Sequence, residues 1–225
     1  MSRHPLIKQK DFLSAAQVFH WATREHFVMW FTGKAGRHRR TEVILPRLVR
    51  HGKLRSLKYG NRLVYCAPRR SRGQQLFVEH GLGCTEGLVR IWRSQMNCLI
   101  IPERYFKGFG NVPEWGIRYP SGKLLIFEFC TSGNFVKPGL INNKIMRYKV
   151  NIPAIEGRFN GEVVVLFVAS IPRRLIQDFI ERFLPEGPFL FSDYQTFKSV
   201  PFGDQLIASI YFWGQNGREY PLKND

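Results

Sequence analysis

The chain has 225 residues, 44% of them hydrophobic and 14% aromatic, which is enough apolar material for a core and excludes global disorder. No apolar run approaches the roughly eighteen residues that cross a bilayer, so no membrane partner is expected. The four cysteines are scattered, without a C-x-x-C pair or histidines at metal spacing. They predict reduced, mostly buried thiols in a cytoplasmic protein, not a disulfide framework or a zinc site.

The positive charge is concentrated in the first third of the chain. The net charge is +17, and residues 1–74 hold 17 Lys and Arg against 3 Asp and Glu, a net of +14, whereas residues 75–225 hold a net of only +3. Like charges at this density repel one another unless a polyanion compensates them. Nucleic acid and membrane headgroups are the two polyanions to consider.

Three short helices are predicted in this basic segment. Residues 10–21 place apolar side chains on one loose helical face. A second helix follows Thr23, which we predict as its N-cap, and glycines within residues 33–36 end it. Thr41 is predicted to cap a third helix that ends at a glycine, Gly52, with Pro46 close enough to its start to be tolerated.

A β-hairpin is predicted directly after the third helix. Residues 54–58 and 63–66 read as strands, joined by a turn over residues 59–62. Three helices followed by a hairpin form a winged helix-turn-helix, which we assign to residues 1–74, with a polar linker at residues 69–73. This fold favours double-stranded DNA as the polyanion, and the alternative is a winged helix that binds another protein.

The basic side chains of this domain occupy the positions where a winged helix meets DNA. A basic cluster precedes the third helix and continues onto its polar side, where a recognition helix enters the major groove. Others lie on the hairpin, within reach of flanking phosphates. The predicted DNA-binding residues are Arg37, Arg39, Arg40, Arg47, Arg50, Arg55, Lys58 and Arg62.

Residues 75–225 are predicted to form an α/β domain. A helix weakened by three glycines, residues 76–92, precedes a strand at 98–101. The other predicted strands are residues 114–119, 124–130, 163–169, 189–191 and 206–213, and the other helices are the later part of 137–150 and residues 173–183. The β-branched run at 163–169 is typical of a strand buried on both faces.

Two carboxylates lie on the strands of one predicted hairpin. Glu114 opens the outer strand, and Glu128 lies between phenylalanines near the end of the return strand. A buried acid must be paired, hydrogen-bonded or metal-bound, so these two could hold Mg²⁺, with Glu86 as a third ligand. The alternative is structural: Glu114 is a surface acid, and Glu128 pairs with Lys144 or Arg147.

The order of these segments resembles the replication-relaxation family of plasmid and mobile-element proteins. The residues that carry the resemblance are 48–54 ending at Val64-Tyr65, His80, Pro113-Glu114, Glu128 with Thr131, Lys144 with Tyr148, and 165–168. The resemblance implies a winged helix-turn-helix joined to a domain similar to the PD-(D/E)xK nuclease fold. It departs from the nuclease pattern at Glu128-Phe129-Cys130, where an active strand would read Glu-x-Lys.

The resemblance implies that Lys144, on the neighbouring helix, takes the place of the missing lysine and acts with Glu114 and Glu128. The leading hypothesis is a double-stranded DNA-binding protein of a plasmid or mobile element, acting in replication, mobilisation or its control. The alternatives are a Mg²⁺-dependent endonuclease and a protein-interaction module that docks on a replication or recombination protein. The oligomeric state stays open, with a homodimer considered because winged-helix proteins often pair on two half-sites.

Overall fold

A computed structural model describes residues 7–32, 38–68, 77–94, 97–110, 113–132, 138–183, 186–199, 211–213 and 219–221. Its helices and two sheets make a mixed α and β fold, which confirms the predicted class at that level. The chain divides into two compact units, Met1–Val89 and Arg90–Asp225. The division falls inside helix α4 (Val78–Ser94), whereas the predicted boundary between residues 74 and 75 lies outside the described residues.

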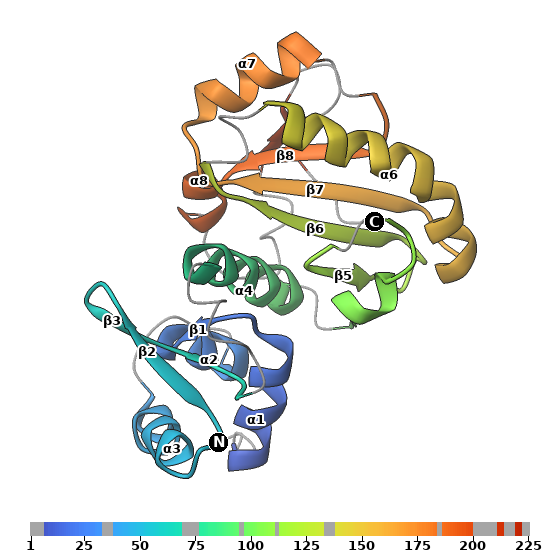
Figure 1. Ribbon diagram of the computed structural model, residues 1–225. Helices are drawn as coiled ribbons and strands as arrows, with labels where there is room; N and C mark the ends of the chain where they lie inside the picture. Colours follow the sequence, from blue (N-terminus) through green and yellow to red (C-terminus); the bar gives the residue numbers. More distant parts are fainter. Residues whose placement is uncertain are drawn as a thin grey trace. The chain divides into compact units, whose positions relative to one another are not determined.

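The first unit contains a small sheet and the helices around it (Figure 1). The sheet is antiparallel, with the strand order β1-β3-β2. The elements in chain order are α1 (Gln9–Val18), β1 (Ala22–Thr23), α2 (Arg24–Thr32), α3 (Arg39–Arg50), β2 (Arg55–Tyr59) and β3 (Arg62–Cys66). The short strand β1, which the sequence did not predict, ties the helices to the hairpin as the third strand of the sheet.

The start of the second helix was predicted correctly, and that of the third was wrong. Thr23 precedes α2, and its hydroxyl accepts a hydrogen bond from the His26 backbone N–H at 3.4 Å. Thr41, in contrast, lies inside α3, whose N-cap is His38. The Thr41 side chain is buried in the core, and Arg39 and Arg40 form the first two residues of the helix. Pro46 lies in the middle of the helix, on its exposed side.

The first turns of α4 complete the core of the first unit. Val78 packs with Trp21 and Val64 in one buried cluster. A side chain at Gly81 would place its Cβ 2.6 Å from the Trp21 ring. The glycine that weakens the helical pattern in the sequence is therefore the residue that lets α4 approach the tryptophan.

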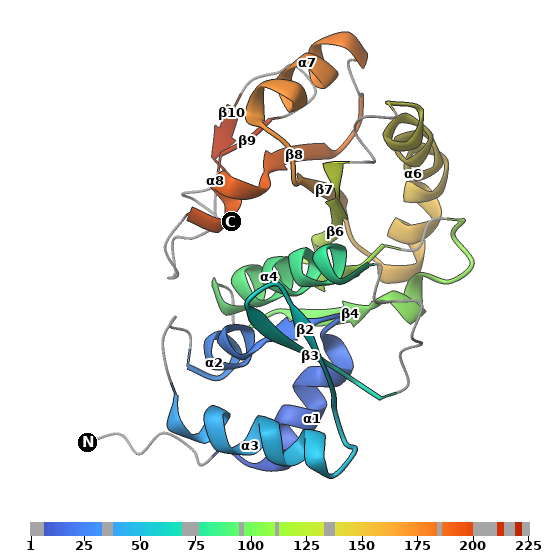
Figure 2. The same ribbon diagram turned by 60° about the vertical axis from the view of Figure 1, so that its left-hand side comes forward.

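The second unit is built on a seven-stranded sheet with the order β10-β9-β8-β7-β6-β5-β4 (Figures 1 and 2). Strands β4 to β6 are antiparallel neighbours, and β6, β7 and β8 run parallel. The elements are β4 (Leu99–Pro102), the 3-10 helix η2 (Glu103–Phe106), β5 (Trp115–Arg118), β6 (Leu124–Cys130), α6 (Pro138–Phe159), β7 (Val163–Ala169), α7 (Arg173–Phe183), β8 (Phe189–Asp193), α8 (Tyr194–Ser199), β9 (Tyr211–Trp213) and β10 (Glu219–Pro221).

Both faces of this sheet are covered. On one face, alternate residues of β6 and β7 join the apolar sides of α6 and α7 in a single core cluster. On the other face, α8 covers the strands: Phe129 contacts Tyr194 edge to face, and the ring centres of Phe127 and Phe197 are 6.2 Å apart. Phe127 also stacks on Trp115, its neighbour on β5, with ring centres 4.2 Å apart. This confirms the prediction that β7 is buried on both sides, because its neighbours share the same two layers.

The largest difference from the predicted elements is the length of α6. The helix continues from residue 150 to Phe159 through Pro153, which lies on its exposed side, because Ile152 and Ile155 hold this part in the core. Residues 206–210 of the last predicted strand lie outside the described residues. None of the described helices is both long and apolar enough to span a membrane.

Candidate nucleic-acid interface and acidic cluster

Helix α3 has one buried face and one strongly basic face. Thr41, Leu45 and Leu48 are buried, as the 3.6-residue period requires for a helix lying on a core. The exposed face carries the four arginines predicted for DNA binding on this helix, namely Arg39, Arg40, Arg47 and Arg50. Arg37, the remaining predicted residue near the helix start, lies outside the described residues.

The hairpin adds a second group of exposed cations. Tyr59 pairs with Arg62 across a two-residue turn, and Gly60 has φ +57°, a conformation that glycine adopts without strain. Arg55, Lys58 and Arg62 are exposed, as is Lys53 before β2. Together with the four arginines of α3, these residues form the basic surface of the first unit.

The basic surface contains very little opposing charge. Between residues 38 and 66 the sequence has one acidic residue, Glu42. Its carboxylate accepts a hydrogen bond from Arg24 of α2 at 3.1 Å, in an exposed ion pair. Its charge is therefore matched by Arg24, and the exposed arginines and lysines of α3 and the hairpin keep a large positive excess.

Glu86, the third predicted metal ligand, is engaged within the first unit. Its Oε2 lies 2.7 Å from His26 Nε2, and the two side chains are only 8% and 6% exposed. The Thr23 backbone N–H donates to His26 Nδ1 at 3.1 Å. Because Nδ1 accepts that bond, Nε2 must carry the proton and donate to Glu86. The pair joins α2 to α4.

Glu128, on β6, is completely buried. Its side chain is 0% exposed, and Lys144 Nζ lies 2.5 Å from Oε2. The Tyr148 hydroxyl donates to the other oxygen, Oε1. Lys144 and Tyr148 are four residues apart on α6, so one face of the helix supplies both donors. Lys144, not Arg147, is therefore the partner of Glu128.

Burial and ion pairing have opposite effects on the pKa values of Glu128 and Lys144. Burial raises the pKa of Glu128 above its ordinary value, and the Lys144 ammonium opposes that rise. Burial alone would lower the pKa of Lys144, but the Glu128 carboxylate outweighs it and raises that pKa, so Lys144 stays protonated at neutral pH. Burial, followed by the charge of Glu128, raises the pKa of Tyr148.

Glu114 belongs to the same electrostatic group. It precedes β5, and its backbone N–H donates to the Phe127 carbonyl at 3.3 Å, which fixes it beside β6. Its charge contributes to the raised pKa of Glu128. The structure thus brings Glu114, Glu128 and Lys144 into one electrostatic group, in which the Lys144 ammonium is bonded to the Glu128 carboxylate.

This arrangement does not fit Mg²⁺. The ion takes six oxygen ligands in a near-ideal octahedron and usually keeps several waters. Both oxygens of Glu128 already accept hydrogen bonds from Lys144 and Tyr148, and the side chain has no exposed surface. A protonated ammonium in that position repels a cation, so no reaction step through a metal follows from these residues.

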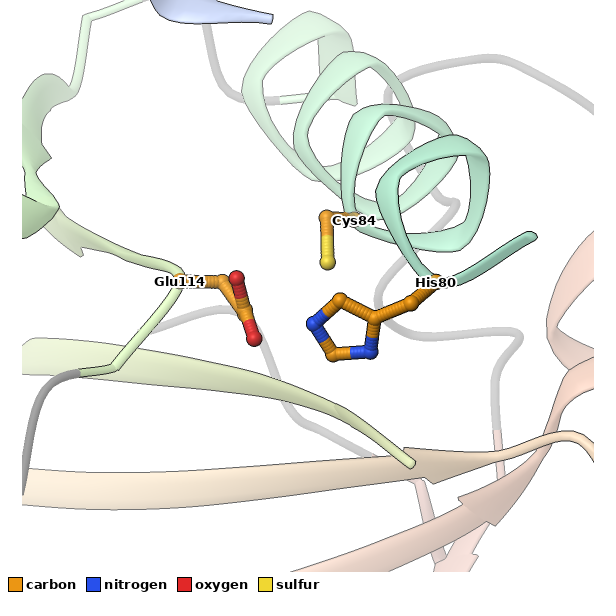
Figure 3. Close-up of side chains that lie close together, drawn as sticks. All are labelled: His80, Cys84 and Glu114. Atoms are coloured by element: carbon orange, nitrogen blue, oxygen red, sulfur yellow. The ribbon is translucent and has the colours of Figure 1, made fainter. Parts of the chain in front are cut away.

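A pair of softer donors lies on the first turns of α4. His80 and Cys84 are one turn apart, and their ligand atoms are within 4.8 Å of each other (Figure 3, which also labels Glu114). Imidazole and thiolate are ligands of zinc, not of magnesium. Cys84 was predicted only as a buried thiol and His80 entered only through the family resemblance; the signal that pairs them is the i, i+4 spacing on one helix.

No protein-family model and no curated protein matches the chain.

Proposed function

We propose that this protein binds double-stranded DNA through α3 and the β2–β3 hairpin. The observation that carries the proposal is the basic surface: exposed arginines and lysines on both elements, with the single intervening acid paired to Arg24. The element order, with a three-stranded sheet ordered β1-β3-β2, supports a winged helix-turn-helix. In that fold α3 is the recognition helix and the hairpin is the wing.

The salt dependence of duplex binding by the full chain tests this proposal. Each phosphate contact releases condensed counterions, so five contacts would give a slope of about −4.5 in log affinity against log salt. Fluorescence anisotropy with a labelled duplex between low and physiological salt measures that slope. An affinity that hardly changes with salt would contradict the electrostatic interface and favour the protein-interaction module.

Single arginine variants locate the interface. Arg47→Ala or Arg50→Ala should weaken duplex binding by about 1–3 kcal/mol if the side chain reads a base, and by less if it touches only phosphate. Arg173→Ala is the matched control, because Arg173 is an exposed arginine at the start of α7 in the second unit. Equal losses in the control and the α3 variants would place the interface elsewhere.

For the wider role we propose replication, mobilisation or their control in a plasmid or mobile element, as the resemblance to the replication-relaxation family suggests. The topology of the second unit supports that reading: three antiparallel strands, α6 and the parallel strand β7 follow one another in an order compatible with a PD-(D/E)xK-like domain. The hydrogen-bonded state of Glu128 favours a structural use of its acidic cluster.

Endonuclease activity is the second candidate, favoured by the grouping of Glu114, Glu128 and Lys144. A plasmid nicking assay with Mg²⁺ or Mn²⁺ separates the two. We expect the wild-type chain to leave supercoiled plasmid intact while retarding it in salt-sensitive fashion. Nicking by the wild type that is lost in Glu128→Gln would establish the nuclease instead.

A further inference from the structure

Val43 is a large apolar side chain left in the open on α3. It is 61% exposed, on the opposite side of the helix from Leu45 and Leu48 in the core. Single exposed apolar residues are ordinary on protein surfaces. The neighbours of Val43 therefore decide whether its exposure has a use.

Those neighbours are arginines. Helical residues four apart lie side by side, so Val43 lies between Arg39 and Arg47, both exposed, and Arg50 continues the same stripe one turn further. Val43 also lines a hollow of about 590 Å³ together with His38, Arg39, Arg40 and Ile44. The basic face of α3 thus has an apolar contact point between its arginines.

Resting on the proposed DNA interface, we infer that Val43 reads the C5-methyl group of a thymine in the major groove. A valine side chain has no hydrogen-bonding atom, so it cannot bind a phosphate or the polar edge of a base. The thymine methyl is the apolar group that base edges present in the major groove. The flanking guanidinium groups hold the duplex through phosphates or guanine edges, and the valine discriminates thymine from cytosine.

Uracil substitution isolates that methyl group. Duplexes are selected from a random library with the full chain, and each thymine of the selected site is then replaced by deoxyuridine, which removes only the methyl. Wild-type affinity should fall about three- to fivefold at one thymine at least, the loss expected for uncovering one methyl-sized apolar group. The other thymines of the site serve as internal controls.

Variants at position 43 assign the effect to this side chain. Val43→Ser should bind the thymine and uracil duplexes equally, whereas Val43→Thr, which keeps one methyl, should retain the preference for thymine. Leu175→Ser is the matched control: Leu175 is 50% exposed on α7 of the second unit, and its loss should change neither affinity. Circular dichroism checks that the exposed substitutions leave the fold intact.

The outcomes separate the two levels of the proposal. Failure to bind any duplex would overturn the DNA interface and the thymine contact together. Duplex binding in which no thymine responds to loss of its methyl, or in which Val43→Ser responds as the wild type does, overturns the thymine contact and leaves the DNA interface standing.

Discussion

Among single residues, Glu128 is a buried acid whose charge is compensated by two side chains of α6. Its carboxylate is fully buried between Lys144 and Tyr148. Glu128→Gln keeps the shape and removes the charge, leaving the Lys144 ammonium without its counterion. We expect a loss of about 3 kcal/mol in unfolding free energy, at the low end for a broken buried pair because the Lys144 side chain is 31% exposed.

Urea denaturation measures this loss of unfolding free energy. The loss should be the same with and without Mg²⁺, because a metal ion that does not bind the native state cannot stabilise it. Metal-dependent stabilisation of the wild type that disappears in Glu128→Gln would contradict the structural interpretation.

The reciprocal variant, Lys144→Met, has a predicted pH dependence. Without the ammonium, burial raises the pKa of Glu128 further, because the largest influence on it in the folded protein is desolvation. A group whose pKa is higher in the folded than in the unfolded protein stabilises the fold fully below its unfolded pKa. That stabilisation is lost as the pH rises through the pKa of the folded state. The destabilisation by Lys144→Met should therefore be small near pH 4 and grow toward neutrality in urea titrations. An equal loss at both pH values would show that Glu128 does not titrate.

At the scale of secondary-structure elements, the hydrogen bond between His26 and Glu86 joins α2 to α4. Glu86→Gln keeps a carbonyl oxygen that can accept from Nε2, whereas Glu86→Leu removes the acceptor and leaves a buried N–H unpaired. The leucine variant should therefore lose about 1–3 kcal/mol more unfolding free energy than the glutamine variant. Thermal or urea unfolding of the full chain compares the two.

A His26→Ala background provides the control, because there the difference between the two Glu86 variants should shrink toward zero.

The packing of α4 changes the expected extent of the N-terminal domain. Val78 and Leu82 of α4 pack against the cluster containing Trp21, so a fragment ending at residue 74 would lack part of its core.

For the whole molecule, buried thiol and phenol groups predict that the stability of the fold decreases at alkaline pH. Burial raises the pKa of Cys130 to about 12, and burial also raises the pKa of Tyr119 and of Tyr148. The ordinary pKa of the thiol is 9.0, so its contribution is complete below that pH and is lost as pH rises toward 12. The midpoint of urea unfolding should fall above pH 9, and less steeply in Cys130→Ala.

The reactivity of the thiols gives a second measurement. No disulfide joins the four cysteines, all of which are described; Cys98 is the partly exposed one, and the other three are buried. A thiol reagent at neutral pH should modify Cys98 first and the others only after denaturation. Rapid native modification of Cys130 would contradict its burial.

The sequence by itself determined most of the helices and strands and the location of the positive charge. Periodicity and turn residues are local signals, which is why the hairpin around Gly60 and the buried strand β7 were predicted closely. The net charge is counted from the sequence without any knowledge of the fold, and so is its concentration before residue 75. The start of α3 was wrong because a threonine near a helix start can cap the helix or enter the core, and only packing distinguishes these.

Tertiary structure decided which side chains meet. The partner of Glu86 is His26, 60 residues away in the chain, and no local pattern announces that contact. Lys144 and Arg147 were equal candidates for Glu128 in the sequence, but only the Lys144 ammonium bonds to the carboxylate, whereas the Arg147 side chain is exposed. The register of a helix on a sheet depends on the packing of the whole core, and it is this register that closes the carboxylate of Glu128 against water and metal.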